Sequence, residues 1–97
     1  AVIHNAQHLI LGTVLDGDVA RAGAAVARAA VDLLGGTYGR TVNVIAGGGN
    51  NGADGRVAAE RLARRGVRTR VVDAAMRPPI LPPADLVIDA AYGTGFR

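Results

Sequence analysis

The stretch TVNVIAGGGNNGADGRVAAERLARRG, residues 41–66, decides the fold of this chain. It begins with a run of β-branched residues that predicts a short strand. Five glycines, two asparagines and an aspartate follow within residues 47–55, and a helical pattern runs over residues 53–66, where glycine ends it. Residues 67–75, VRTRVVDAA, predict a second strand. A strand, a loop, a helix and a strand make a βαβ unit, so the sequence predicts a parallel sheet.

The flanking segments extend this unit on both sides. Residues 15–36 carry small and apolar side chains at helical spacing, between capping aspartates and a pair of glycines. Residues 86–90 predict a third strand, and residues 76–83 hold all four prolines, which makes them a non-helical connection. Residues 1–14 are compatible with a helix or with an extended arm. We expect one domain over residues 1–97.

Composition excludes several classes of site. The chain has 97 residues without cysteine or lysine, which excludes disulfides, a Gly-Lys-Ser/Thr phosphate loop and a Schiff-base lysine. The formal net charge of +3 permits an anionic ligand. No apolar run is long enough for a membrane span, so no membrane partner is expected. The absence of cysteine fits a reducing compartment, and we expect a cytoplasmic protein.

Two general interpretations of the glycine-rich loop come first. An Asn-Gly hairpin turn needs a second strand directly after it, whereas here a helical pattern follows. A dinucleotide fingerprint is met by Gly47, Gly49 and Gly52 at G-x-G-x-x-G spacing, with Asp73 about 20 residues later as a candidate ribose ligand. Asp73 could equally cap the turn that follows it.

The polar side chains of the loop indicate a third kind of site. Asn50, Asn51 and Asp54 have no role in a dinucleotide fingerprint, and an inward carboxylate would repel a phosphate. Asp89 lies at the end of the third predicted strand. The carboxyl ends of parallel strands lie at the same edge of a sheet, where ligands bind. Amide and carboxylate oxygens suit a hard cation or a hydroxyl-bearing ligand.

Two segments taken together resemble the YjeF N-terminal domain family, the NAD(P)H-hydrate epimerases. The loop GGGNNGADG is similar to the N-N-G-G-D-G loop of that family, with Ala53 in place of the second glycine. The segment DAAYGTG, residues 89–95, is similar to its D-A-hydrophobe-hydrophobe-G-x-G motif. The helix containing RAGAAVARAA resembles the small-residue helix before the first strand of the family. The resemblance covers residues 15–97 and implies an α/β, Rossmann-like three-layer αβα fold with a mostly parallel sheet.

The resemblance also implies an activity and a set of site residues. Members of the family interconvert the R and S hydrates of NADH and NADPH (NADHX and NADPHX), which are damaged cofactors. It implies Asp89 as the catalytic residue and a potassium ion held by Asn51 and Asp89. The residues that it implies for binding the nucleotide substrate are Asn50, Asn51, Gly52, Ala53, Asp54, Gly93, Thr94, Gly95, Phe96 and Arg97.

The chain departs from the family pattern in two places. It ends before the D-x-P-S-G motif of the family, whose aspartate contacts the substrate, and residues 76–83 leave no room for a further helix and strand before Asp89. We therefore expect an abbreviated or truncated member with an incomplete sheet. Two alternatives are a non-catalytic binding or dimerisation module of the same fold and an ordinary Rossmann dinucleotide-binding half-domain.

Other candidate residues point to surfaces rather than to chemistry. His4 and His8 lack further metal ligands, so a solvated or partner-facing segment is expected for them. The arginines of residues 61–70 fit a solvated helix end, and the scarcity of aromatic residues argues against a nucleic-acid partner. Tyr92 could pack or contact the ligand. The smooth Ala/Gly helix and the incomplete sheet predict self-association, most simply a homodimer.

Overall fold

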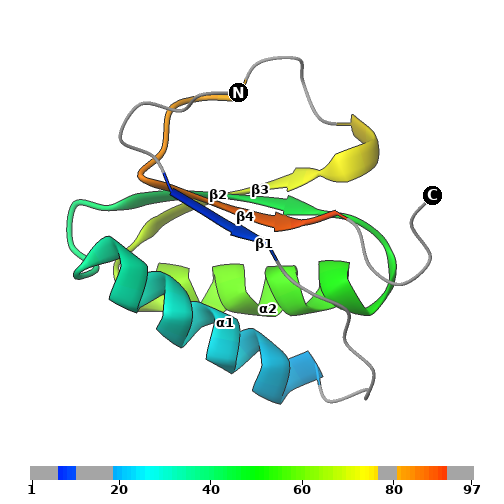
Figure 1. Cartoon of the computed structure of the whole chain (residues 1–97), viewed down its shortest axis with the longest axis horizontal. Coiled ribbons are helices and arrows are strands. Elements are labelled where there is room, and N and C mark those ends of the chain that lie inside the picture. The colour runs from blue at the N-terminus through cyan, green and yellow to red at the C-terminus, as the bar shows by residue number, and fades with distance from the viewer. Residues whose placement is uncertain (1–6, 11–18, 77–80, 92–97) are drawn as a thin grey trace.

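The computed structural model describes residues 7–10, 19–76 and 81–91 of the chain. They form a parallel sheet with two long helices on one of its faces (Figure 1). Neither helix has both the length and the apolarity that crossing a membrane requires, and no other helix of the described residues does. In chain order the elements are β1 (Gln7–Ile10), α1 (Val19–Leu34), β2 (Thr41–Ala46), α2 (Gly49–Arg64), β3 (Arg68–Asp73), the 3-10 turn η1 (Ala74–Met76) and β4 (Leu86–Ala90).

The strand order β1-β4-β2-β3 explains the position of the helices. The connections from β1 to β2 and from β2 to β3 advance in the same direction, so the right-handed crossover rule places α1 and α2 on the same face. The connection from β3 to β4 returns past β2, and the same rule places it on the opposite face. Figure 1 shows this arrangement, with both helices on one side of the sheet and residues 81–85 on the other. The predicted α/β fold with a parallel sheet is confirmed. Of the three layers expected, the described residues supply the sheet and one helical layer, in line with the predicted incomplete fold.

Small side chains let α1 and α2 approach each other closely. A Cβ added at Gly23 of α1 would lie 2.5 Å from Cβ of Val57 and 3.1 Å from the carbonyl oxygen of Asp54, so only glycine fits there. The core lies between this helix pair and the sheet, and aliphatic side chains fill it. Its buried members are Ala27, Ala30, Leu34, Val42, Val44, Ala58, Ala59, Leu62, Val67, Leu86 and Ile88.

Hydrogen bonds attach the residues that precede β4 to the first residues of β2. The Asn43 side chain is 1% exposed; its Nδ2 donates to the carbonyl of Pro82 at 2.7 Å, and its Oδ1 accepts from Arg70 at 2.8 Å. The Asp85 carboxylate accepts the backbone N–H of Thr41 at 2.8 Å, and the Asp85 N–H donates to the Thr41 carbonyl at 2.8 Å. These hydrogen bonds hold residues 82–85 on the sheet face opposite to α1 and α2.

The structure corrects two predicted boundaries. Residues 7–10 form β1, a parallel strand on β4, rather than a helix or an arm; the rest of residues 1–14, including His4, lies outside the described residues. Only pairing with β4, distant in sequence, defines such a short strand. The second helix begins at Gly49 rather than at Ala53. Gly49 has a φ of 75°, and this left-handed residue turns the chain so that both asparagines join the helix.

Candidate functional site

The candidate site is the carboxyl edge of the sheet, where β2 and β4 end side by side and α2 begins. The register pairs Ile45 with Asp89 and Ala46 with Ala90, so the two central strands end at the same level. The N–H of Gly47 donates to the Ala90 carbonyl at 3.1 Å and continues this pairing into the loop. Sequence reasoning expected the glycine loop and Asp89 at one edge of a parallel sheet, and the structure places them there.

Three backbone segments meet so tightly at this edge that side chains are excluded. A Cβ added at Gly47 would collide with the carbonyl oxygen of Ala91, and one at Gly52 would collide with the carbonyl oxygen of Gly47. A Cβ at Gly55 would lie 2.7 Å from the Ala90 side chain. The end of β2, the end of β4 and the first turn of α2 therefore pack backbone to backbone. Several of the loop glycines are explained by this packing rather than by flexibility.

The first turn of α2 presents backbone N–H groups to the site. Gly48 is the N-cap residue, with φ −79° and ψ 175°, and it has no side chain that could accept a hydrogen bond. The first turn of α2 contains no acidic residue. A helix N-terminus carries partial positive charge and free amide donors, which favour an anion such as a phosphate group.

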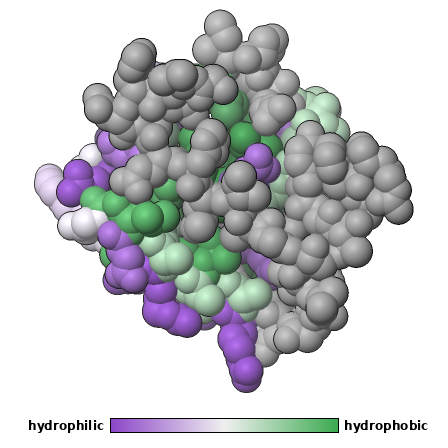
Figure 2. All heavy atoms as spheres, in the orientation of Figure 1, coloured by the Kyte–Doolittle hydropathy of each residue, from purple (hydrophilic) through white to green (hydrophobic). Residues whose placement is uncertain are grey.

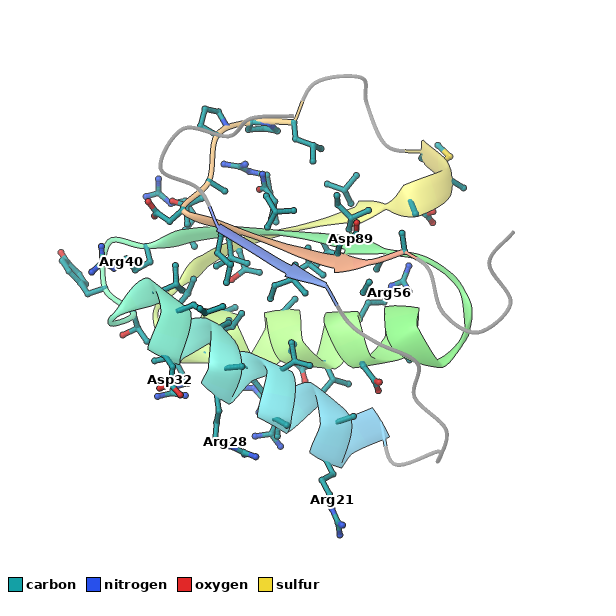
Figure 3. The ribbon with its side chains drawn as sticks, in the orientation of Figure 1. Arg21, Arg28, Asp32, Arg40, Arg56 and Asp89 are labelled. Carbon is teal, nitrogen blue, oxygen red and sulfur yellow. The ribbon has the colours of Figure 1, made fainter. Side chains whose placement is uncertain are left out.

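Arg56 adds a full positive charge beside the loop. Its guanidinium donates to the carbonyl of Gly47 at 3.0 Å, and the residue is otherwise exposed. Figure 3 shows the Arg56 side chain between α2 and the end of the sheet, on the same side of the view as Asp89. Arg56 was not among the site residues predicted from the sequence. The available signal was a basic residue one helical turn after Gly52.

Asp89 is the carboxylate of the predicted set that lies at the sheet edge. It belongs to β4, between Ile10 of β1 and Ile45 of β2, and it is half-buried. Side chains alternate along a strand, and buried Ile88 faces the helices, so Asp89 faces the side opposite to them. Its Oδ1 accepts the backbone N–H of Ala91 at 3.1 Å, which orients the carboxylate over the end of the strand.

Asp54 occupies a different environment from the one expected for a ligand-binding residue. Its side chain is 0% exposed, within α2, and three residues before Val57, which contacts α1. Residues three apart share one face of a helix, so Asp54 lies on the strip that faces α1. The structure thus places Asp54 inside the helical layer rather than on the open edge.

The remaining predicted residues divide between the first turn of α2 and the undescribed end of the chain. Asn50, Asn51, Gly52 and Ala53 all belong to α2, so the structure brings their backbone to the carboxyl edge. Residues 92–97, which include Tyr92 and the predicted nucleotide-binding stretch, lie outside the described residues.

Asp73 has a structural partner at the end of β3. Its Oδ1 accepts the backbone N–H of Ala75 at 2.9 Å and so caps the η1 turn. Sequence reasoning weighed this cap equally with a ribose contact. The observed bond accounts for Asp73 without a nucleotide, which weakens the ordinary dinucleotide interpretation of the loop.

The helical layer carries a positive outer surface. Figure 2 shows hydrophilic side chains along the lower and left rim of the view, over α1, and Figure 3 shows Arg21 and Arg28 pointing away from that helix. Glu60 forms an ion pair with Arg64 at 2.8 Å, so part of the charge of α2 is balanced locally. The excess of arginines over acidic side chains on this surface attracts anions. The exposed arginines of the described residues are Arg21, Arg28, Arg56, Arg61, Arg64, Arg65 and Arg68.

Comparison with known proteins identifies a family over most of the chain. A family model described as YjeF-related protein N-terminus matches residues 19–81. The match begins at the first residue of α1, includes the glycine loop and ends before Asp89. No curated protein and no solved structure matches the chain.

Proposed function

We propose, from the premise that this chain belongs to the YjeF-related N-terminal family, that it binds a hydrated nicotinamide nucleotide, NADHX or NADPHX. The ligand would lie at the carboxyl edge of the sheet, and the chain would interconvert its R and S forms. One observation carries the proposal: the glycine-rich start of α2 follows β2 and Asp89 belongs to the end of β4, so both lie at the ends of adjacent parallel strands. Such an edge is where ligands of open α/β sheets bind.

The nucleotide half of the ligand suits the start of α2. Its pyrophosphate is anionic, and the first-turn N–H groups with Arg56 nearby offer donors and positive charge. Tight backbone packing at Gly47 and Gly52 holds this turn against the ends of β2 and β4. Preorganised backbone donors bind an anion without first having to be ordered.

The hydrated nicotinamide half requires acid–base chemistry. Epimerisation at the hydroxyl-bearing carbon can proceed by loss of water and its return on the other face of the ring. A protonated carboxyl group would give its proton to the departing hydroxyl, and the carboxylate would take a proton back from the returning water. Asp89 is the candidate, because it is half-buried at the edge whereas Asp54 is inside the helical layer.

A potassium ion fits the chemistry of the donors at this edge. Asp89 uses one carboxylate lone pair for the Ala91 N–H, and its other lone pairs remain for a hard cation and for the proton that it transfers. In the proposal Asn51 and Asp89 hold the ion, which supplies positive charge close to the nucleotide. The described residues contain no cluster of three or more His, Cys, Asp or Glu side chains, so a transition-metal site there is not proposed.

The direct test is epimerisation of a single stereoisomer. Purified chain is mixed with the S form of NADPHX, and chromatography follows the appearance of the R form against the rate without protein. The Asp89→Asn variant should lose about 100-fold or more of the acceleration, as expected for a general acid–base group. The Asp73→Asn variant is the matched control and should retain it, because Asp73 caps a turn. Equal rates for wild type and Asp89→Asn would contradict the assignment.

A second candidate is binding without turnover, as in a non-catalytic module of the same fold. It is favoured by the burial of Asp54, which leaves Asp89 as the one accessible carboxylate of the predicted site among the described residues. Calorimetric titration with NADPHX in potassium chloride and in sodium chloride separates the two. Potassium-dependent binding without accelerated epimerisation would support the module, and no binding in either salt would contradict both.

A further inference from the structure

The outer edge of β3 has the features of a contact surface. β3 is the last strand of the sheet in the described residues, and Val71 in its middle is 47% exposed. A groove of about 270 Å³ lies beside it, between β3 and α2. Edge strands of this kind present unpaired backbone groups to another chain. The groove is lined by Arg56, Ala59, Glu60, Ala63, Thr69 and Val71.

The hydrogen-bonding pattern shows which residues of β3 face outward. The N–H of Arg68 donates at 2.9 Å to the carbonyl of Arg40, the residue immediately before β2. The backbone N–H and C=O groups of Arg68 therefore point towards β2. Backbone groups of a strand point alternately to its two sides. The N–H and C=O groups of Thr69, Val71 and Asp73 therefore point away from the sheet.

The sequence of β3 is self-complementary when two copies run antiparallel. A two-fold axis through the Val71 pair places Thr69 of each copy opposite Asp73 of the other. All three outward-facing residues of each copy then lie in hydrogen-bonded pairs. On the helical side Val71 contacts Val71 of the other copy, which covers the exposed apolar side chain. An isologous contact of this kind closes as a dimer.

Charge disfavours the neighbouring register that is centred on Arg70. Moving the axis to Arg70 would set two arginines directly opposite each other and leave Asp73 facing Val67, which lies outside the strand. Like charges directly opposite on paired strands are destabilising. We propose that two copies of this chain pair through β3, antiparallel and centred on Val71, so that the four described strands of each copy join into one continuous sheet. This dimer goes beyond the proposed ligand site and does not depend on it.

Sedimentation equilibrium of the full chain tests the pairing. The wild type should show a concentration-dependent dimer, and Val71→Lys should raise its dissociation constant at least tenfold, because two charges would meet at the axis. Leu33→Lys is the matched control: Leu33 is 41% exposed on α1, an element that contributes no residue to the groove beside β3, and this variant should dimerise as the wild type does. Circular dichroism checks that each variant is folded. A wild-type monomer at every concentration, or equal weakening by both variants, would overturn the proposal.

Cross-linking tests the register, because the chain has no cysteine of its own. Under mild oxidation the variants Thr69→Cys and Asp73→Cys, when mixed, should form a disulfide-linked heterodimer, since these positions face each other. Either variant alone should link much more slowly. Rapid linking of Thr69→Cys to itself, or of Arg70→Cys to itself, would contradict the Val71-centred register. This readout survives even if Val71→Lys unfolds.

Discussion

Gly52 has no space for a side chain, because its Cβ would collide with the carbonyl oxygen of Gly47 and lie 2.6 Å from its carbon. Gly48 is directly next to Gly47 in the chain, yet a Cβ added to it would face open space, and its φ of −79° is ordinary. The five glycines of the loop therefore have different roles. Some permit close approach of backbone, and Gly49 permits a left-handed turn.

The contrast between Gly52 and Gly48 gives a prediction at this scale. Gly52→Ala should destabilise the fold by about 3 kcal/mol, because the colliding atom belongs to backbone that cannot rotate away. Gly48→Ala should change the free energy of unfolding by less than about 1 kcal/mol. Urea denaturation of the two variants measures the difference. Equal stability of the two would mean that the loop adjusts to the added methyl group.

At the scale of elements, α1 and α2 pack closely because a glycine of one helix contacts a β-branched residue of the other. Gly23 costs α1 about 1 kcal/mol of helix propensity relative to alanine. Its retention is explained by the contact with Val57. The connection that contains the prolines is held to the sheet in another way. Hydrogen bonds of Asn43 and Asp85 attach it, where a helix would be attached by the packing of apolar side chains.

A double-mutant cycle tests the helix contact. Gly23→Ala should destabilise the chain by about 1–3 kcal/mol despite its better helix propensity, because overpacking outweighs the gain. Adding Val57→Ala should recover much of that loss, since the shorter side chain leaves room for the new methyl group. Thermal or urea unfolding of both single variants and the double variant gives the coupling energy. Additive effects would contradict the contact.

At the scale of the whole molecule, the described residues form one helical layer on a four-stranded sheet, so the core between them is small. The two faces of its sheet differ: one is packed against α1 and α2, and the other carries a short connection and Asp89. The Asp89 edge and the β3 edge lie on different strands; Arg56 takes part in the proposed ligand site and also lines the groove beside β3, but the variants at Asp89 and Val71 do not alter it. Ligand binding and self-association can therefore be tested independently.

Dimerisation through β3 predicts that stability depends on protein concentration. The midpoint of thermal unfolding should rise with total chain concentration for the wild type, because association stabilises the folded state by mass action. The midpoint for Val71→Lys should stay constant over the same range. Differential scanning calorimetry at several concentrations measures both. A wild-type midpoint that does not move would argue against the pairing.

Some features of the site followed from local sequence and others could not. Helical spacing and β-branched runs identified α1, α2, β2, β3 and β4, because these patterns depend on near neighbours. The asparagines were assigned to a loop, because polar residues beside glycines resemble a turn until Gly49 is seen to start the helix. Arg56 was missed, because its partner is a backbone carbonyl that has no signal in sequence.

The amino-acid sequence by itself determined a parallel βαβ unit, a glycine loop at its carboxyl edge and the family to which the chain belongs. Periodicity, caps and motif spacing are properties of neighbouring residues, so they can be recognised without the fold. Only the tertiary structure decided that residues 7–10 add a strand, that Asp54 is buried and that Asp89 faces away from the helices. These depend on which distant segments pack together, and that is set by strand order and by the handedness of the connections.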